Sequence, residues 1–299
     1  MSIKVKKVSK SYGTQKALNE ISFEIKKGEV VGFLGPNGAG KSTLMKILTG
    51  SIKPTSGHVK VADFDIDEHP IKAKRKIGYL PEHNPLYHEM YVKEYLNFSA
   101  DIYGVSHELV AEVIKKTGLA NEQQKLIGAL SKGYRQRVGL AQALIHQPEV
   151  LILDEPSTGL DPNQLVDMRS LIREIGKERT VMLSTHILQE IEAICDRIII
   201  MNKGQIVADK SIEELQSLTK KKRIITVEFD QSISKKDLLK IKHTREVIDL
   251  KGCQYKIISD PKFDLRPALF DFAVAQNITV LQMNVEEEKL ETIFHNLTR

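Results

Sequence analysis

The stretch "VVGFLGPNGAGKST", residues 30–43, decides the fold of this chain. Its first part is an apolar run that predicts a buried strand, and its last part opens a helix that Gly50 and Pro54 bring to an end. Between them, residues 35–42 match the pattern G-x-x-x-x-G-K-[ST] in the strand–loop–helix setting that the pattern requires. Glycines let backbone N–H groups turn inward, and the helix N-terminus adds partial positive charge, so the stretch predicts a phosphate site.

The polar residues of this loop have separate expected roles. Lys41 is expected to reach the β- and γ-phosphates, Ser42 to bind Mg²⁺, and Thr43 to support the phosphates from the next helical position. A glycine-rich turn without function is the alternative, and the flanking strand and helix argue against it. The predicted nucleotide-binding residues are Gly35, Pro36, Asn37, Gly38, Ala39, Gly40, Lys41, Ser42 and Thr43.

Two further strand ends carry side chains suited to the same chemistry. The apolar run in "VLILDEPSTGLDP", residues 150–162, ends on Asp154 and Glu155, and the run "MLST" ends beside His186. Asp154 is suited to be an outer-shell Mg²⁺ ligand, and Glu155 is then placed to orient and deprotonate an attacking water. We expect His186 to sense the γ-phosphate. The alternatives are an acidic pair at a solvated strand end and a histidine with a structural role.

Composition limits the class of protein. The chain has 299 residues, 41% hydrophobic and 28% charged side chains, and a formal net charge of +5. This length predicts two domains, and the mild basic excess is compatible with a membrane-surface or nucleic-acid partner without requiring one. No apolar run reaches the roughly 18 residues of a membrane-spanning helix, and the start lacks the apolar core of a signal peptide, so we expect a cytoplasmic protein. Cys195 and Cys253 are expected to be reduced, buried thiols.

Hydrophobic periodicity predicts the order of the elements. Apolar strands alternate with helical patterns at about 163–176 and 187–195, which indicates a largely parallel sheet covered on both faces. Residues 57–66, "GHVKVADFDI", are interpreted as one short strand, and residues 84–130 as mainly helical.

The composition changes near residue 220. Lys220–Arg223 is expected to be a solvated linker. The order of elements after it predicts a split-βαβ, ferredoxin-like module. Its expected elements are strand 223–230, helix 234–241, strands 245–250 and 253–259, helix 264–276 and strand 278–284. A last helix, 286–297, is expected to place Leu290, Ile293, Phe294 and Leu297 on one stripe.

Together, these motifs resemble the ATP-binding cassette (ABC) family over about residues 3–215. "GPNGAGKST" is similar to the family's Walker A motif, "LILDEP" to Walker B, "STGLDP" to the D-loop and "STH" to the switch motif. Residues 130–137, "LSKGYRQR", look like the family signature usually written LSGGQ, and "SYG" places Tyr12 where the family stacks an aromatic ring on adenine. The resemblance adds these site residues: Tyr12, Glu82, Ser131, Lys132, Gly133, Tyr134 and Asp161.

The resemblance also implies a fold. We expect an α/β P-loop NTPase cassette over residues 1–218, with a mainly parallel sheet, an antiparallel β subdomain and a helical subdomain at about 84–148. Residues 219–299 are expected to form the accessory α+β, ferredoxin-like domain. ATP and Mg²⁺ are the implied cofactors. Ser42, Asp154 and Glu82 are expected to bind the metal, Glu155 to act as the general base, and His186, the switch histidine, to be the second catalytic residue.

The partners follow from the same resemblance. The family implies a head-to-tail dimer of identical or different cassettes, with ATP between the phosphate loop of one chain and Ser131 and Gly133 of the other. An integral membrane permease is the expected partner, which would place the chain peripherally on the cytoplasmic face of the inner membrane. Nucleic acid is not expected as a partner.

Two departures from the family pattern affect these expectations. Lys132 and Tyr134 stand where the signature usually has Gly and Gln, but Ser131 and Gly133 are kept, so we expect activity to survive. Glu82 stands in the Q-loop where Gln is typical. Its carboxylate can reach Mg²⁺ or a water but cannot donate a hydrogen bond as an amide does.

Within the family, the segment after residue 220 is similar to the accessory domain of single-cassette subunits of the drug- and polymer-export types. Several stretches, among them "YLPEHNPLY" and "EEEKLETIFHNLT", are similar to the ATP-binding subunits associated with gliding motility in Bacteroidetes-type bacteria. An ATPase subunit of a membrane exporter is therefore the preferred reading. The alternatives are a soluble ABC-family ATPase acting on ribosomes or nucleic acid, and a non-enzymatic regulatory subunit.

Overall fold

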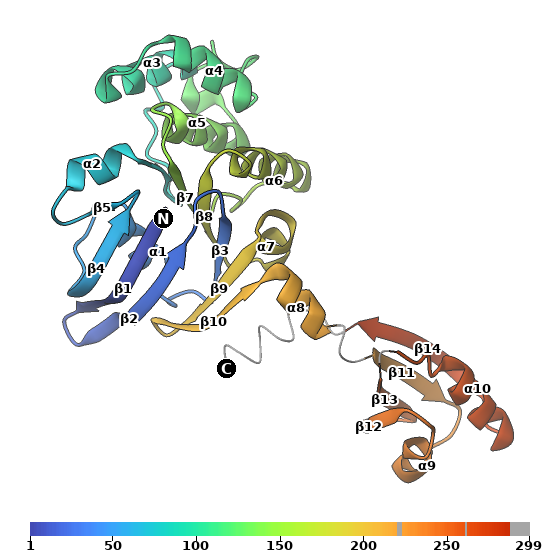
Figure 1. Ribbon diagram of the computed structural model, residues 1–299. Helices are drawn as coiled ribbons and strands as arrows, with labels where there is room; N and C mark the ends of the chain where they lie inside the picture. Colours follow the sequence, from blue (N-terminus) through green and yellow to red (C-terminus); the bar gives the residue numbers. More distant parts are fainter. Residues whose placement is uncertain (220–222, 261, 288–299) are drawn as a thin grey trace. The chain divides into compact units, whose positions relative to one another are not determined.

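The computed structural model describes residues 1–219, 223–260 and 262–287 of the chain (Figure 1). These residues form two compact units, Met1–Ile212 and a second unit that begins at Glu213. The division lies close to the domain boundary expected at residue 218. Within the described ranges, no helix is long and apolar enough to cross a membrane.

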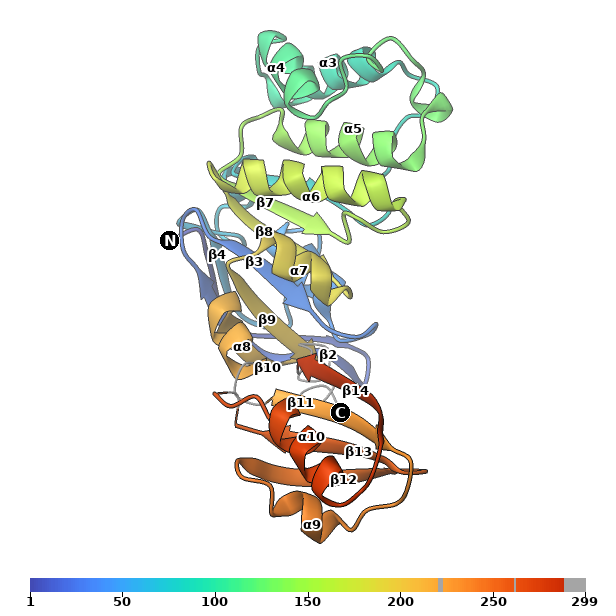
Figure 2. The same cartoon turned by 90° about the vertical axis from the view of Figure 1, so that its right-hand side faces the viewer.

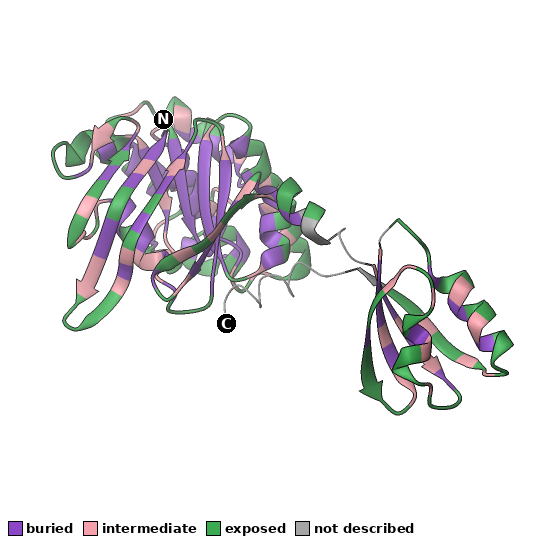
Figure 3. Ribbon diagram, turned by 60° about the horizontal axis from the view of Figure 1, so that its bottom comes forward, coloured by how far each residue is buried: buried purple, intermediate pink, exposed green. Residues whose placement is uncertain are grey.

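A six-stranded sheet forms the centre of the first unit. In spatial order its strands are β10 (Gln205–Ser211), β9 (Arg197–Asn202), β3 (Val30–Leu34), β8 (Thr180–Thr185), β7 (Val150–Asp154) and β6 (Ile77–Leu80). From β9 to β6 the neighbours run parallel, and β10 joins the edge antiparallel to β9. Every residue of β3, β7 and β8 is buried, as is typical of strands covered on both faces (Figure 3). The predicted largely parallel sheet is confirmed.

Helices cover both faces of this sheet, and Figure 2 shows α6 and α7 in front of one face. On one face, α1 (Lys41–Leu48) packs into the main apolar core with Phe33 and Met182. On the other, α6 (Pro162–Gly176) contacts β8, and α7 (Leu188–Ile194) contacts β8 and β3. A Cβ at Gly32 would lie 2.1 Å from Ile191 of α7, so the helix packs tightly on the strand that leads to the phosphate loop.

An antiparallel sheet completes the core. Its spatial order is β2 (Gln15–Ile25), β1 (Ile3–Tyr12), β4 (Ser56–Val61) and β5 (Phe64–Asp65). Phe23 of β2 meets Phe33 of β3 edge to face at 5.1 Å, which joins this sheet to the central one. The interpretation of residues 57–66 as one strand is wrong: Ala62 and Asp63 have φ of 47° and 67° and turn the chain into a hairpin.

The helical subdomain lies at the β6 edge of the sheet. Its elements are α3 (Val92–Tyr103), α4 (Glu108–Lys116), the 3₁₀ helix Ile127–Ala129 and α5 (Lys132–Leu144). A short helix, α2 (Pro70–Arg75), precedes β6. The loop after β6 is fixed to α5, because Asn84 Nδ2 donates a hydrogen bond to the Arg135 carbonyl at 3.0 Å.

The second unit begins within α8 (Ile212–Thr219), a helix that the sequence analysis did not predict. The unit continues as β11 (Arg223–Phe229), α9 (Lys235–Leu239), β12 (Thr244–Lys251), β13 (Gln254–Ser259), α10 (Arg266–Ala275) and β14 (Val280–Glu287). Its sheet has the antiparallel order β12-β13-β11-β14, which is the predicted ferredoxin-like arrangement. Phe229, Tyr255 and Leu269 are central in its core.

The last predicted helix, the linker and the two cysteines differ from expectation or lie partly outside the described residues. Glu286 and Glu287 belong to β14 rather than to the start of a last helix, because they pair with Ile224 and Arg223 in the sheet. The rest of the predicted helix, with its stripe, and residues 220–222 of the linker lie outside the described residues. Both cysteines are free, but only Cys195 is buried; Cys253 is half-buried because it lies in the turn after β12.

Candidate functional site

The loop between β3 and α1 has the conformation that its glycines predict. Gly38 and Gly40 have φ of 81° and 103°, and a Cβ at Gly40 would lie 2.7 Å from the Ala17 carbonyl oxygen, so glycine is required there. Gly40 is the N-cap of α1 and provides no side-chain acceptor, which leaves the first N–H groups of the helix available to an anion. The loop is also tied to the β9–β10 turn, where the Gly204 N–H donates to the Ala39 carbonyl at 3.1 Å.

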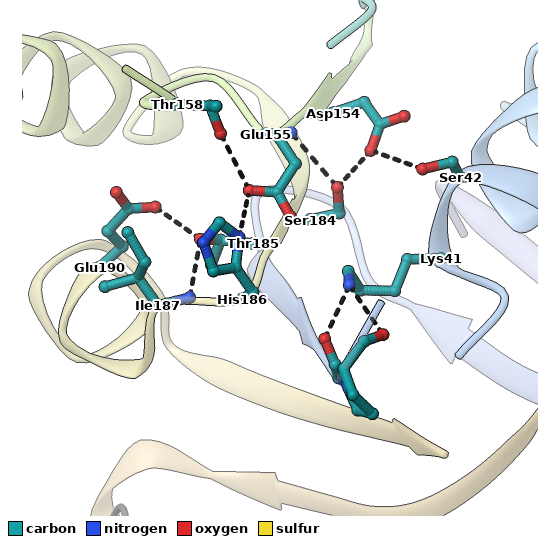
Figure 4. Close-up of polar contacts among 12 residues, drawn as sticks. Lys41, Ser42, Asp154, Glu155, Thr158, Ser184, Thr185, His186, Ile187 and Glu190 are labelled. Carbon is teal, nitrogen blue, oxygen red and sulfur yellow. Dashed lines mark hydrogen bonds and ion pairs between the residues drawn. The ribbon is translucent and has the colours of Figure 1, made fainter. Parts of the chain in front are cut away.

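The Lys41 ammonium group lies inside this loop (Figure 4). The residue is only 6% exposed, and Nζ donates to the Gly35 carbonyl at 2.7 Å and to that of Pro36 at 3.4 Å. Burial lowers the pKa of Lys41, and the nearby carboxylates Glu155, Asp154 and Glu82 oppose that shift. The site therefore holds a desolvated cation ready to meet a strongly anionic ligand.

Asp154 and Ser42 are neighbours at the carboxyl ends of the parallel strands. Asp154 is 3% exposed and accepts hydrogen bonds from Ser184 Oγ at 2.5 Å and from Ser42 Oγ at 3.4 Å (Figure 4). Burial, reinforced by Asp154 and Glu82, raises the pKa of Tyr79 to about 12. Two oxygen donors so close together fit Mg²⁺, which is typically held by one or two carboxylates and substrate phosphates. In the described chain, no group of three or more His, Cys, Asp or Glu could hold a metal alone.

Glu155 has a strained backbone and a firmly held side chain. Its φ of 51° is unusual for a residue with a Cβ and is enforced by the buried turn after β7, where its N–H donates to the Ser184 carbonyl at 3.1 Å. Thr158 Oγ1 lies 3.1 Å and His186 Nδ1 2.9 Å from Glu155 Oε2 (Figure 4). The carboxylate is 8% exposed, whereas half of the His186 side chain is exposed. Glu155 is therefore suited to act as a base whose carboxylate is oriented by two hydrogen-bond donors, Thr158 and His186.

One cavity of about 580 Å³ brings most of these residues together. It is lined by the predicted residues Tyr12, Asn37, Gly38, Ala39, Gly40, Lys41, Ser42, Thr43, Glu82, Glu155 and His186. Tyr12 is 51% exposed, with Lys10 Nζ 5.2 Å from its ring centroid. The cavity is also lined by five residues that were not predicted from the sequence: Gln15, Lys16, Ala17, Thr158 and Lys203. Of these five residues, only Thr158 could have been inferred from the sequence, because it lies three residues after Glu155.

The signature residues do not line this cavity. Ser131 is the N-cap of α5 and accepts a hydrogen bond from the Tyr134 N–H at 3.4 Å. Gly133 is buried against Gln164 of α6, whereas Lys132 and Tyr134 are exposed. Asp161 caps α6 by accepting from the Gln164 N–H at 2.9 Å, and it too lies away from the cavity.

A second cavity, of about 470 Å³, adjoins the first. Glu82 and Thr158 line both cavities, and Lys132 lines the second together with His83 and His88. The loop after β6 thus connects the region around α5 to the first cavity.

Comparison with known proteins gives a consistent result. A family model described as "ABC transporter" matches residues 18–158. The chain is 35% identical over 299 residues to the bacitracin transport ATP-binding protein BcrA of Bacillus licheniformis, covering 99% of this chain and 96% of that protein. It is 33% identical over 311 residues to the linearmycin resistance ATP-binding protein LnrL of Bacillus subtilis, covering 99% and 98%.

A solved structure extends the comparison to the fold. The dimeric ATP-binding cassette MJ0796, in a post-hydrolysis state bound to ADP and Pi, matches with a TM-score of 0.63 and 27% identity. The match covers 70% of this chain and 98% of that one.

Proposed function

The chain belongs to the ABC transporter family of ATP-binding proteins, and from this premise we propose that it closes into a dimer around ATP and Mg²⁺ and drives a separate membrane permease. As a member of this family it is an ATPase. The observation that carries the proposal is the single cavity in which the Lys41 loop, Glu155 and His186 meet.

The residues of the cavity support separate roles in binding the phosphates, stacking on adenine, activating water and holding Mg²⁺. The N–H groups of the loop and of α1, with Lys41, would bind the phosphates, and the exposed Tyr12 ring would stack on the adenine. Glu155 would take the proton of the attacking water while Thr158 and His186 hold its carboxylate. Ser42 and Asp154 would hold Mg²⁺, which neutralises phosphate charge when it is bound, with Glu82 close by.

The place of the signature supports the dimer. Ser131 begins a helix whose N-terminal N–H groups suit phosphate, yet it does not line the cavity of its own chain. A second cassette in head-to-tail orientation would bring Ser131 and Gly133 to the open side of that cavity. The related cassette MJ0796 is dimeric with ADP and Pi bound.

An aromatic surface next to the second cavity supports the permease partner. Tyr87, Tyr91 and Phe98 are 53%, 50% and 42% exposed, and Tyr87 packs against Phe98 at 6.1 Å. Exposed apolar clusters of this kind are typical of protein contacts. We propose that the permease's cytoplasmic helices bind here, which places the chain on the cytoplasmic face of the inner membrane.

Export is the direction that we propose. Relatives that match over nearly the whole chain are named for bacitracin transport and linearmycin resistance, which supports export as the direction of transport. A link to gliding motility stays a prediction from the similar stretches. A soluble ATPase acting on ribosomes or nucleic acid is less well supported, because the near full-length relatives include a transport protein.

The test is to purify the full-length chain carrying Glu155→Gln from native membranes in the presence of ATP. We expect an integral membrane protein to co-purify with ATP and to be released when ADP replaces it. Ribosomal proteins or nucleic acid in its place would contradict the permease and support the alternative.

A further inference from the structure

A second carboxylate, Glu190, lies buried close to the switch histidine. The residue is on α7 and is 1% exposed. Its Oε2 accepts a hydrogen bond from Thr185 Oγ1 at 2.7 Å, whereas its Oε1 has no hydrogen-bond partner in the described part of the chain. Glu190 does not line the nucleotide cavity.

Packing alone does not account for this carboxylate. A buried polar atom without a partner costs free energy, and a carboxylate costs more than an amide or a hydroxyl. An apolar side chain of similar size would avoid that cost. A half-satisfied carboxylate at this position therefore calls for a role in the site.

The hydrogen bonds lead from Glu190 to the turn that carries His186. Thr185 Oγ1 donates to Glu190 and also accepts from the Ile187 N–H at 3.1 Å, so one hydroxyl bridges both sides of His186 (Figure 4). His186 Nδ1 in turn lies 2.9 Å from Glu155 Oε2. Because half of the His186 side chain is exposed, packing does not fix its direction, and the turn must do so.

We propose that Glu190 is a positioning residue: by fixing the Thr185 hydroxyl, it holds the turn 185–187 and so aims His186 at Glu155. This inference rests on the proposed ATPase function. We expect Glu190 to affect the chemical step rather than ATP binding. The contacts that link Glu190, Thr185, His186 and Glu155 do not include the loop 35–43, which would bind the phosphates.

The experiment is a double-mutant cycle in steady-state ATP hydrolysis with the full-length chain. We expect Glu190→Ala to lower kcat about tenfold with the KM for ATP within about twofold of wild type. Glu190→Gln should lose no more than about threefold, because its amide oxygen can still accept from Thr185. In a His186→Ala background, Glu190→Ala should change kcat by less than about twofold, because residues that act in series are not additive.

Controls separate this role from a general loss of structure. Glu192→Gln makes the same charge change at an exposed glutamate on the same helix and should leave kcat within about twofold of wild type. A melting curve of Glu190→Ala shows whether that variant itself folds. If Glu190→Ala does not fold, Thr185→Val takes its place in the cycle. We then expect the same fall in kcat in the wild-type background and the same absence of a further fall in the His186→Ala background.

An equal fall in kcat in both backgrounds, or a parallel rise in KM, would overturn the positioning role. A wild-type chain without ATPase activity would instead refute the proposed function, so the two failures are distinguishable.

Discussion

At the scale of single residues, Glu155 combines an unfavourable backbone with two contacts to one carboxylate oxygen. A left-handed φ costs on the order of 1–3 kcal/mol for a residue with a Cβ, so the buried turn after β7 must stabilise it. The sequence predicted the acid and its role from its place at a strand end. It could not predict the contact with Thr158, because that contact depends on how the turn closes.

Replacing Glu155 with Gln tests the role of the general base. The amide keeps the shape but cannot accept a proton, so we expect ATP turnover to fall by about 10²–10⁴ while ATP binding persists. Steady-state hydrolysis and calorimetry measure the two quantities. Glu174→Gln, an exposed change on α6, is the control. A turnover within about threefold of wild type would rule out the role.

The lowered pKa of Lys41 predicts a pH dependence of ATP affinity. Burial disfavours the ammonium form, so in the free protein Lys41 loses its proton below the ordinary lysine pKa of 10.5. The neutral amine does not attract phosphates, so ATP affinity should fall as the pH rises into this alkaline range. Calorimetric Kd values measured across that range would show the fall.

Two variants bracket this prediction. Lys41→Arg should show no alkaline fall of this kind, because guanidinium does not titrate there. Lys41→Ala should lose nucleotide binding at every pH. If the ATP affinity of the wild-type chain stays constant through the alkaline range, the prediction that Lys41 has a lowered pKa and binds ATP as a cation is wrong.

At the scale of elements, the strand–loop–helix unit around residues 30–43 was predictable because each of its signals is local. An apolar run, glycines with positive φ and a helix start all lie next to one another in the sequence. The turn at Ala62 and Asp63 was missed because Ala62 is not a usual turn former and Asp63 is followed by Phe64 rather than by the glycine of a typical hairpin signal. The pairing of β4 with β5 closes the hairpin over these two residues.

The contact between α5 and β6 depends on one glycine. A Cβ at Gly78 would lie 2.2 Å from the Ala143 carbonyl oxygen, which is backbone and cannot simply move aside. We expect Gly78→Ala to lower the free energy of unfolding by about 1–3 kcal/mol, as overpacking usually does. Urea denaturation followed by circular dichroism measures the change. An unchanged unfolding midpoint would show that α5 can shift without cost.

At the scale of the whole molecule, the sequence predicted the element order that the ferredoxin-like unit has, because periodic patterns identify elements and their order. It could not say which residues share a cavity. Ser131 and Asp161 belong to the same set of motifs as Lys41, yet they are helix caps away from the cavity that Lys41 lines. For Ser131 the family resemblance already implied this separation, because it assigned Ser131 to the ATP of a second chain; for Asp161 the separation appears only once the chain is folded.

The same separation predicts a change in assembly. With ATP, the Glu155→Gln variant should convert from monomer to dimer, because ATP would join two cassettes and hydrolysis would not remove it. Light scattering coupled to size exclusion measures the mass. Adding Ser131→Arg should restore the monomer by blocking the site in the second chain, while the exposed change Lys177→Arg should not. A monomer with saturating ATP would contradict the dimer.

The backbone bond between Gly204 and Ala39 has a consequence for the free protein. Through this bond, the turn between β9 and β10 holds the loop 35–42 in place. The same turn also packs closely on β2, and this requires a glycine at 204, because a Cβ there would lie 2.6 Å from the Ala17 carbonyl oxygen. The conformational entropy of the loop is thus lost on folding rather than on ligand capture. In heavy water, the amide proton of Gly204 should therefore exchange slowly even before any nucleotide is added.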